Sequence, residues 1–573
     1  MRNLHWDDNM IYEIADKCVK EVEKLSDNWE IYLANSESIE VESKKDILNF
    51  AKEEIENGIG IRIIKDNKIG FAYTSDLDKI EQTAKKALDN AKLNKIDENY
   101  EFASVEKVKD VKGTYDKKYD DLTLDECCEF LENIIERTKE NKCDITSSGF
   151  SASKGEELIL NSNGVSIYDK GTGFGGSLSV NIEKDGQFTT TYDYTASRHL
   201  DLEYEQLTDD VCKLAQDSLN PKAIETKDCD VVLDYFAASG LLSTFIQGFN
   251  SENVLRGRSI LHDKIGSQIT SENLSIIDNP LLEGAMGTCK ADGEGTVSKK
   301  TVLVEDGILK SFIYDIYNSN KADCESTSNG YRGSYLTTPD VSPSNLEFKF
   351  KTNVGIDEID SGIITTSVLG AHTANPISGD FSVEANNAFV IENGEIKDGI
   401  KKAMISGNIY ELMGKCDGVK SEIKQKGSFI IPKILVHDLK VIGLWCDTMN
   451  TRLNELLNIN PNEATQKDND ALIEELKTSK LIMPVEIESD NDEIDESFRF
   501  RPVKIMDENK KTFIPLYSDD SEVHGNTSAI DIYTKDLANM IEDNPENING
   551  VVINPFSKFN VELPMDSFLK IFK

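Results

Sequence analysis

Residues 370–413 read GAHTANPISGDFSVEANNAFVIENGEIKDGIKKAMISGNIYELM, and this stretch holds the clearest turn signal in the chain. Asn393-Gly394 separates two apolar runs, 389–391 and 403–405, and Asn-Gly tolerates positive φ at both central positions of a type I′ hairpin turn. Asn408 is expected to cap a short helix that runs to Met413. The polar residues before the hairpin are then a loop on a rigid scaffold, where function is often found. The alternative is an ordinary surface loop of turn residues.

Outward from this stretch, the chain alternates between helical and strand periodicity. Helices are expected at 7–25, 77–93, 123–138, 207–219 and 236–249. Further hairpin turns are expected at Asp66-Asn67, Asn163-Gly164 and Asp306-Gly307. The fold class is therefore α+β and multi-domain: an N-terminal α+β module (1–95), a second α+β module (115–222), a strand-rich third domain (228–443) and a small α/β C-terminal domain (450–573). Within the last domain, the acidic run 489–497 predicts a solvated loop.

The charge balance limits the kinds of partner. The 573 residues include 103 acidic and 63 basic side chains, for a formal net charge of −40. Such a surface repels phosphate backbones and anionic lipids, so we expect neither nucleic acid nor a membrane as a partner. No signal peptide and no bilayer-length apolar run is visible. The ten cysteines include no C-x-x-C, which favours reduced thiols and a cytoplasmic location.

The histidines do not show the pattern of a zinc peptidase. Such enzymes usually place two histidines on one helical face, with a glutamate beside the first. None of the six histidines is followed by glutamate, and no two are spaced to share a helical face. A site assembled from distant residues stays open.

Two other kinds of catalytic or binding motif are weak. No G-x-S-x-G nucleophile elbow occurs, and Cys289 has only Lys290 beside it, which favours a buried inert thiol over a reactive one. The glycine-rich run 171–176 is not followed by a helix, as a phosphate-binding loop would be. We expect a flexible turn or a close backbone approach there.

The remaining candidates are polar loops of the third domain, at 278–280, 292–296, 326–330 and 372–380. If these loops converge, they line a polar groove that could hold an extended peptide, partly by strand addition. We expect the peptide or interface contacts to come from His372, Asn375, Asp380, Asp292 and Glu294, with no catalytic residue among them. The alternative for a lone histidine such as His372 is a satisfied structural role.

In this order, the loops resemble the TldD/PmbA family, and its PmbA (TldE) branch in particular. The resemblance covers about residues 7–443 and rests on GRS at 257–259, IIDNP at 276–280, DGEG at 292–295, STSNG at 326–330, PSNL at 343–346 and GAHTANPISGDFS at 370–382. It implies a cytoplasmic metallopeptidase pair, built from a TldD-type and a TldE-type subunit, that cuts unfolded peptides or small peptide precursors.

One departure from the family pattern changes the expected role. TldD-type chains carry H-E-x-x-x-H on the helix expected here, where this sequence places Leu242, Ser243 and Gln247. Leucine cannot bind zinc, glutamine is a poor neutral ligand, and serine cannot replace the carboxylate base. The resemblance therefore implies a non-catalytic subunit with no metal or cofactor of its own, with zinc only in a TldD-like partner. That partner, or a second copy of this chain, would complete a dimer.

The last part of the chain is similar to the SseB family over about residues 450–573. The likeness rests on residues 472–487, 513–518 and 550–555, and it implies an interaction module. It also supports an alternative function, a self-associating binding or scaffold protein without enzymatic activity. A third hypothesis is an autonomous hydrolase that uses Asp292, Glu294 or Asp380 as acid and base.

Overall fold

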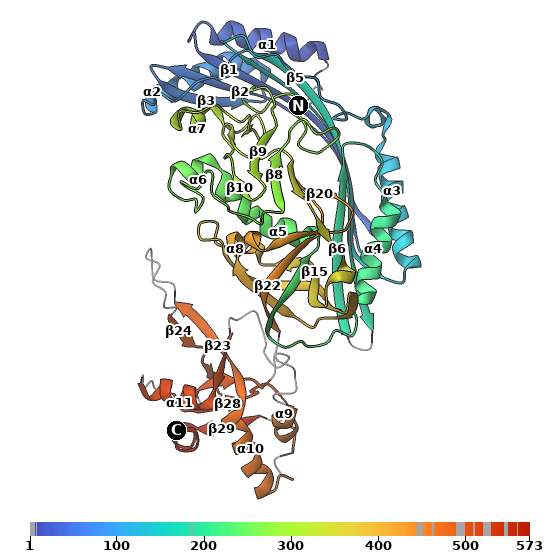
Figure 1. The fold of residues 1–573 in the computed structure, drawn as a ribbon, viewed down its shortest axis with the longest axis vertical. Coiled ribbons are helices and arrows are strands. Elements are labelled where there is room, and N and C mark those ends of the chain that lie inside the picture. Colours follow the sequence, from blue (N-terminus) through green and yellow to red (C-terminus); the bar gives the residue numbers. More distant parts are fainter. Residues whose placement is uncertain are drawn as a thin grey trace. The chain divides into compact units, whose positions relative to one another are not determined.

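The computed structural model describes residues 6, 8–184, 187–443, 451–460, 463–488, 499–507, 510–518, 529–543, 548–557 and 560–573. The chain divides into two compact units, 1–444 and 445–573, drawn in Figure 1. The predicted acidic loop at 489–497 lies outside the described residues. The chain is a multi-domain α+β protein, which confirms the predicted fold class.

A six-stranded antiparallel sheet dominates the first part of unit one, in the order β3-β2-β1-β4-β5-β6. Its strands are β1 (Trp29–Lys44), β2 (Ile47–Lys65), β3 (Lys68–Thr74), β4 (Asp144–Asn161), β5 (Ser166–Lys184) and β6 (Gln187–Ser197). β1 pairs with β4 along its length, from Glu30↔Asn161 to Lys44↔Ser147. The strands of the two expected N-terminal modules therefore form one continuous sheet.

Four helices cover one face of this sheet: α1 (Asp8–Val22), α2 (Ile80–Leu93), α3 (Leu124–Glu140) and α4 (Tyr204–Asp217). Alternate residues of β1 serve both helix pairs, because Ile31 and Leu33 pack in the cluster of α1 and α2 while Ile39 and Val41 pack in that of α3 and α4. The opposite face of the sheet is concave and receives the third domain (Figure 1).

The glycine-rich run 171–176 does not form the flexible turn that the sequence predicted. That prediction is wrong, because these residues lie inside β5 and pair continuously with β4. The predicted close backbone approach is present, since a Cβ at Gly171 would lie 3.2 Å from the carbonyl oxygen of Thr114, and Nη1 of Arg198 would lie closer still, at 2.6 Å. The small residues leave room on the concave face of the sheet.

The third domain is built around a closed ring of five strands. The ring runs β7-β15-β16-β18-β22 and returns to β7, because β22 pairs with both β18 and β7. Its strands are β7 (Lys227–Leu233), β15 (Ser361–Leu369), β16 (Asp380–Glu392), β18 (Ala403–Asn408) and β22 (Ile434–Gly443). The predicted apolar helix is present as α5 (Tyr235–Ile246), followed by the 3-10 turn η3 (Gln247–Phe249), and it packs into the core of this domain.

A second six-stranded sheet in this domain has the order β10-β9-β8-β13-β21-β20. Its strands are β8 (Leu274–Asp278), β9 (Thr301–Glu305), β10 (Ile308–Leu309), β13 (Leu346–Phe350), β20 (Lys424–Lys426) and β21 (Phe429–Ile431). The remaining elements are α6 (Ser251–Leu255), α7 (Ile316–Lys321), β11 (Gly330–Tyr331), β12 (Asp340–Val341), β14 (Asn353–Val354), β17 (Glu395–Gly399), α8 (Ile409–Gly414) and β19 (Cys416–Val419).

The hairpin predicted at Asn393-Gly394 forms at that turn. Asn393 and Gly394 have φ of 50° and 76°, as a type I′ turn requires. The strand after the turn is β17, however, whereas β18 pairs with the earlier half of β16. Asn408 caps α8 by accepting a hydrogen bond from the N–H of Tyr410, as expected.

Unit two has its own apolar core. Its sheets have the orders β24-β23-β27 and β25-β26-β28-β29. Its elements are α9 (Thr451–Leu457), α10 (Gln466–Thr478), β23 (Lys480–Glu488), β24 (Arg499–Pro502), β25 (Ile505–Met506), β26 (Thr512–Leu516), β27 (Ala529–Tyr533), α11 (Thr534–Asp543), β28 (Gly550–Ile553), β29 (Val561–Pro564) and α12 (Met565–Phe572). Among the described residues of the whole chain, no helix is long and apolar enough to cross a membrane.

Candidate functional site

The positions that correspond to H-E-x-x-x-H lie on α5 and at its end. Leu242 points into the core, with 2% of its surface exposed. Ser243 and Gln247 are exposed, and the Ser243 hydroxyl donates to the carbonyl of Gly240 at 2.6 Å within its own helix. An aliphatic side chain, a hydroxyl and an amide do not fit a zinc ion, which needs imidazole, thiolate or carboxylate ligands. In the part of the chain that the structure describes, no group of three or more His, Cys, Asp and Glu side chains is arranged to hold a metal.

The loop with His372, Asn375 and Asp380 connects β15 to β16 beside α5. Its first part is a 3-10 turn, η5 (Ala371–Thr373), and a Cβ at Gly240 of α5 would lie 3.6 Å from the Cβ of Ala371. All three predicted residues of this loop are exposed. His372 lies in η5, at the surface.

Asn375 and Asp380 both shape this loop. The side-chain oxygen of Asn375 accepts hydrogen bonds from the N–H groups of Ile377 (2.9 Å) and Ser378 (3.1 Å). The Asp380 carboxylate accepts from the Asn408 amide and the Ser378 hydroxyl, each at 2.8 Å, and these bonds hold the pKa of Asp380 below its ordinary value. The loop is therefore ordered by its own polar side chains and exposed along α5.

Asp292 and Glu294 lie elsewhere and are buried, with 8% and 2% of their surface exposed. Asp292 accepts from the N–H groups of Glu294 (3.0 Å), Thr296 (2.9 Å) and Gly330 (2.9 Å). Glu294 accepts from the N–H of Ile316 at 2.8 Å. Burial raises the pKa of Asp292 to about 6 and that of Glu294 to about 8.

The five predicted contact residues therefore do not meet in one groove. Asp292 and Glu294 are buried where the third domain meets the long sheet, while His372, Asn375 and Asp380 lie on the exposed loop beside α5. A general acid and a general base must reach the same substrate. Asp380 therefore cannot act as such a pair with Asp292 or Glu294, because it lies apart from them. The predicted groove was conditional on these loops converging, and the sequence shows only that each of them lies between strands.

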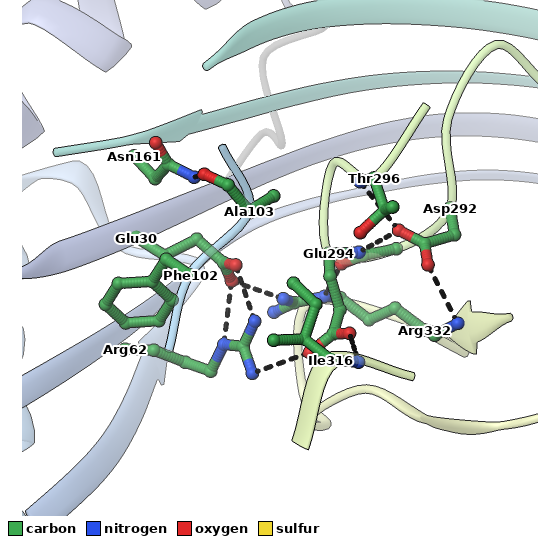
Figure 2. Close-up of polar contacts among 12 residues, drawn as sticks. Glu30, Arg62, Phe102, Ala103, Asn161, Asp292, Glu294, Thr296, Ile316 and Arg332 are labelled. Carbon is green, nitrogen blue, oxygen red and sulfur yellow. Dashed lines mark hydrogen bonds and ion pairs between the residues drawn. The ribbon is translucent and has the colours of Figure 1, made fainter. Parts of the chain in front are cut away.

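Sequence reasoning missed a buried ion network that surrounds Glu294 (Figure 2). Arg62 of β2 binds Glu30 of β1 with two hydrogen bonds, at 2.8 and 2.5 Å, and its Nη1 lies 3.5 Å from Glu294. Arg332 of the third domain donates to the same Glu30. Although burial alone would raise it, the two guanidinium groups hold the pKa of Glu30 below its ordinary value. The network thus ties the long sheet to the third domain by charge-assisted bonds.

A cavity of about 540 Å³ lies beside this network, between the concave face of the sheet and loops of the third domain. The sheet contributes residues of β4 and β5, and the loops contribute Asp292 and Cys289 among others. Burial raises the pKa of Cys289 to about 12, so its thiolate is not available as a nucleophile. The lining contains neither Ser243 nor a residue of the loop 370–380.

Comparison with protein families matches most of the chain. Three models of one family match in sequence order: PmbA/TldA metallopeptidase domain 1 at residues 29–91, the central domain at 117–219 and the C-terminal domain at 226–443. A model of the SseB protein N-terminal domain matches residues 453–567.

Individual relatives show the same relationship. An uncharacterized protein of Methanocaldococcus jannaschii is 37% identical over 422 residues, which is 73% of this chain and 98% of that protein. Metalloprotease PmbA of Escherichia coli O157:H7 is 24% identical over 73% of this chain and 93% of its own length. The crystal structure of TldE from Thermococcus kodakarensis superposes with a TM-score of 0.71 at 26% identity, and covers 75% of this chain and 100% of that one.

Proposed function

Because this chain belongs to the PmbA/TldD metallopeptidase family, we propose that it is a TldE-type subunit without a zinc site of its own. In this proposal a TldD-like chain supplies the zinc and the catalytic base, and the pair cuts unfolded peptides or small peptide precursors in the cytoplasm. The observation that carries the proposal is the chemistry of α5, where Leu242, Ser243 and Gln247 offer no competent zinc ligand.

The geometry of α5 supports this assignment further. Leu242 belongs to the apolar core of the third domain, so its replacement by an imidazole would bury a polar group. Ser243 already bonds within its helix. The helix thus serves packing, and its exposed face, with Ser243 and Gln247, is left for contact with a peptide or a partner subunit.

We assign the peptide or partner contact to the loop of His372, Asn375 and Asp380. This loop is exposed and packs beside α5. Strand addition within the five-stranded ring is not open to a peptide, because each ring strand is already paired on both sides. Side-chain contacts from the loop, rather than a new ladder in the ring, are therefore the expected mode of binding.

The test is to purify the full chain alone and with a TldD-like chain from the same host that carries H-E-x-x-x-H. We expect the lone chain to hold far less than one zinc per chain by elemental analysis and to leave an unfolded peptide intact. The mixture should cleave it, and His-to-Ala substitution in the TldD-like chain should abolish cleavage. Stoichiometric zinc together with hydrolysis by the lone chain would end the proposal.

A second candidate function is a non-enzymatic binding or scaffold protein that associates with itself. The observation that favours it is the separate core of unit two, which allows an SseB-like module to bind a partner independently. Affinity capture of the tagged chain from its host separates the two functions. Recovery of a TldD-like chain supports the peptidase subunit, whereas recovery of this chain with only unrelated proteins supports the scaffold.

A further inference from the structure

The cavity of about 540 Å³ between the long sheet and the third domain has the size of a small-molecule site. Its floor is a place where the sheet lacks side chains. Gly155 of β4 lies opposite Gly171 of β5, and a Cβ at Gly155 would meet no heavy atom within 4 Å. The space above Gly155 is therefore open, whereas the guanidinium of Arg198 lies over Gly171.

A carboxylate without a cation faces this cavity. Glu157 lies directly across from Asp169, and two like charges in opposite positions of a sheet destabilise it. Asp169 is engaged by Lys290, whose N–H donates at 2.8 Å and whose Nζ lies 3.9 Å away. Glu157 is bound by the Tyr32 hydroxyl, but no cation among the described residues lies within ion-pair distance of it.

A guanidinium without a carboxylate faces the same cavity. Arg198 crosses over Gly171 and donates to the carbonyls of Thr172 (3.2 Å), Ala285 (3.5 Å) and Met286. These three bonds leave two of its five N–H donors for another acceptor. Within the described part of the chain, no carboxylate is within ion-pair distance of this guanidinium. Burial raises the pKa of Glu157, and the guanidinium groups of Arg332 and Arg198 oppose that rise from a distance.

We propose that this cavity binds a small zwitterion, a free α-amino acid or a dipeptide, with its carboxylate on Arg198 and its ammonium on Glu157. A guanidinium binds a carboxylate through paired N–H groups, and a carboxylate is the natural acceptor for an ammonium. A zwitterion supplies both missing counter-charges at once. The site lies apart from α5 and from the loop of His372, so it does not depend on the peptidase role proposed above.

The test is calorimetric titration of the full chain with alanine and with alanyl-alanine, each also in N-acetylated and C-amidated form. We expect at least one free form to bind about tenfold or more tightly than its blocked forms, since each blocking group removes one ion pair. Glu157→Gln should weaken binding of the free form and remove its advantage over the N-acetylated form. Gly155→Leu should abolish binding by filling open space, and circular dichroism should show that both variants are folded.

The matched control is Glu183→Gln, an exposed glutamate further along β5, which should bind like the parent chain. Three results would each overturn the assignment: no binding of either free ligand up to about 10 mM, equal binding of free and blocked forms, or undiminished binding by Gly155→Leu. None of these measurements requires a TldD-like partner, so failure here is distinct from failure of the proposed function.

Discussion

Replacement of Glu30 by glutamine is expected to destabilise unit one by about 3–5 kcal/mol, because it leaves buried guanidinium groups without their carboxylate. Glu30 is 1% exposed and accepts from both Arg62 and Arg332. Glutamine keeps the shape of the side chain but carries no charge, and its NH₂ group would face a guanidinium donor. Among the described residues, Nη1 of Arg332 already has no hydrogen-bond partner, so no described acceptor is spare to compensate.

The loss of folding stability caused by Glu30→Gln should be larger at low pH than at high pH. In the parent chain, burial raises the pKa of Glu294 to about 8, so this residue is largely protonated in acid. Once Glu30 is neutral, Glu294 is the carboxyl group nearest Arg62, at 3.5 Å, and its ionisation becomes favourable. The folded variant then binds fewer protons than the folded parent, so its stability relative to the parent rises with pH. The loss is expected to be largest near pH 5 and smallest near pH 9.

Tryptophan fluorescence during urea unfolding measures this effect locally. Trp6 and Trp29 are buried in the core between α1, α2 and the long sheet. The third tryptophan, Trp445, can be replaced by phenylalanine to leave a signal from this region alone. Glu40→Gln, an exposed change in the same strand, is the matched control and should stay within about 0.5 kcal/mol of the parent. A loss below about 1 kcal/mol, or one that is the same at both pH values, would refute the reasoning.

Three further predictions follow from the same contacts. Glu294→Gln should flatten the dependence of folding stability on pH, as measured by urea unfolding. In the parent, the pKa of Glu294 is raised from 4.5 to about 8, so the parent loses stability as pH rises between these two values. A neutral amide does not titrate, so the variant should not show this loss. Asn408→Ala removes the cap of α8 and two bonds to the loop 378–380, so it should cost about 1 kcal/mol and speed hydrogen exchange at 375–380 but not in β5. Gly70→Ala places a Cβ 2.0 Å from the Ala87 carbonyl of α2 and should cost about 1–3 kcal/mol in thermal unfolding, whereas Gly155→Ala, which meets open space, should be close to neutral.

Local chemistry was predictable from the sequence. The turn at Asn393-Gly394 and the cap at Asn408 depend on residues a few positions apart, and the structure contains both. The apolar helix at 236–249 was also predictable, because most of its residues are apolar. Such features are set by the backbone preferences of the residues themselves.

Long-range pairing was not predictable in the same way. Residues 34–38 (ANSES) interrupt the apolar alternation, so the sequence predicts two short strands, 29–33 and 39–42, where β1 is continuous. Asn35 lies on the helix-covered face, where its amide donates to the carbonyl of Trp6 and to the carboxylate of Glu156. A single sequence does not show these contacts, so the polar residues there cannot be told from a loop. The ion network was missed for a related reason, since Glu30, Arg62 and Arg332 are brought together by sheet pairing and domain packing.

The closed ring of the third domain has a consequence for how the chain can be rearranged. β7, where the domain begins, lies beside β22, where it ends, and a Cβ at Gly443 would collide with the carbonyl of Ile224. The first and last residues of the domain, 227 and 443, therefore lie close together, as the termini of a domain that tolerates circular permutation do. New termini could be cut into one of its surface loops and the old ones joined by a short linker, with every strand keeping its neighbours.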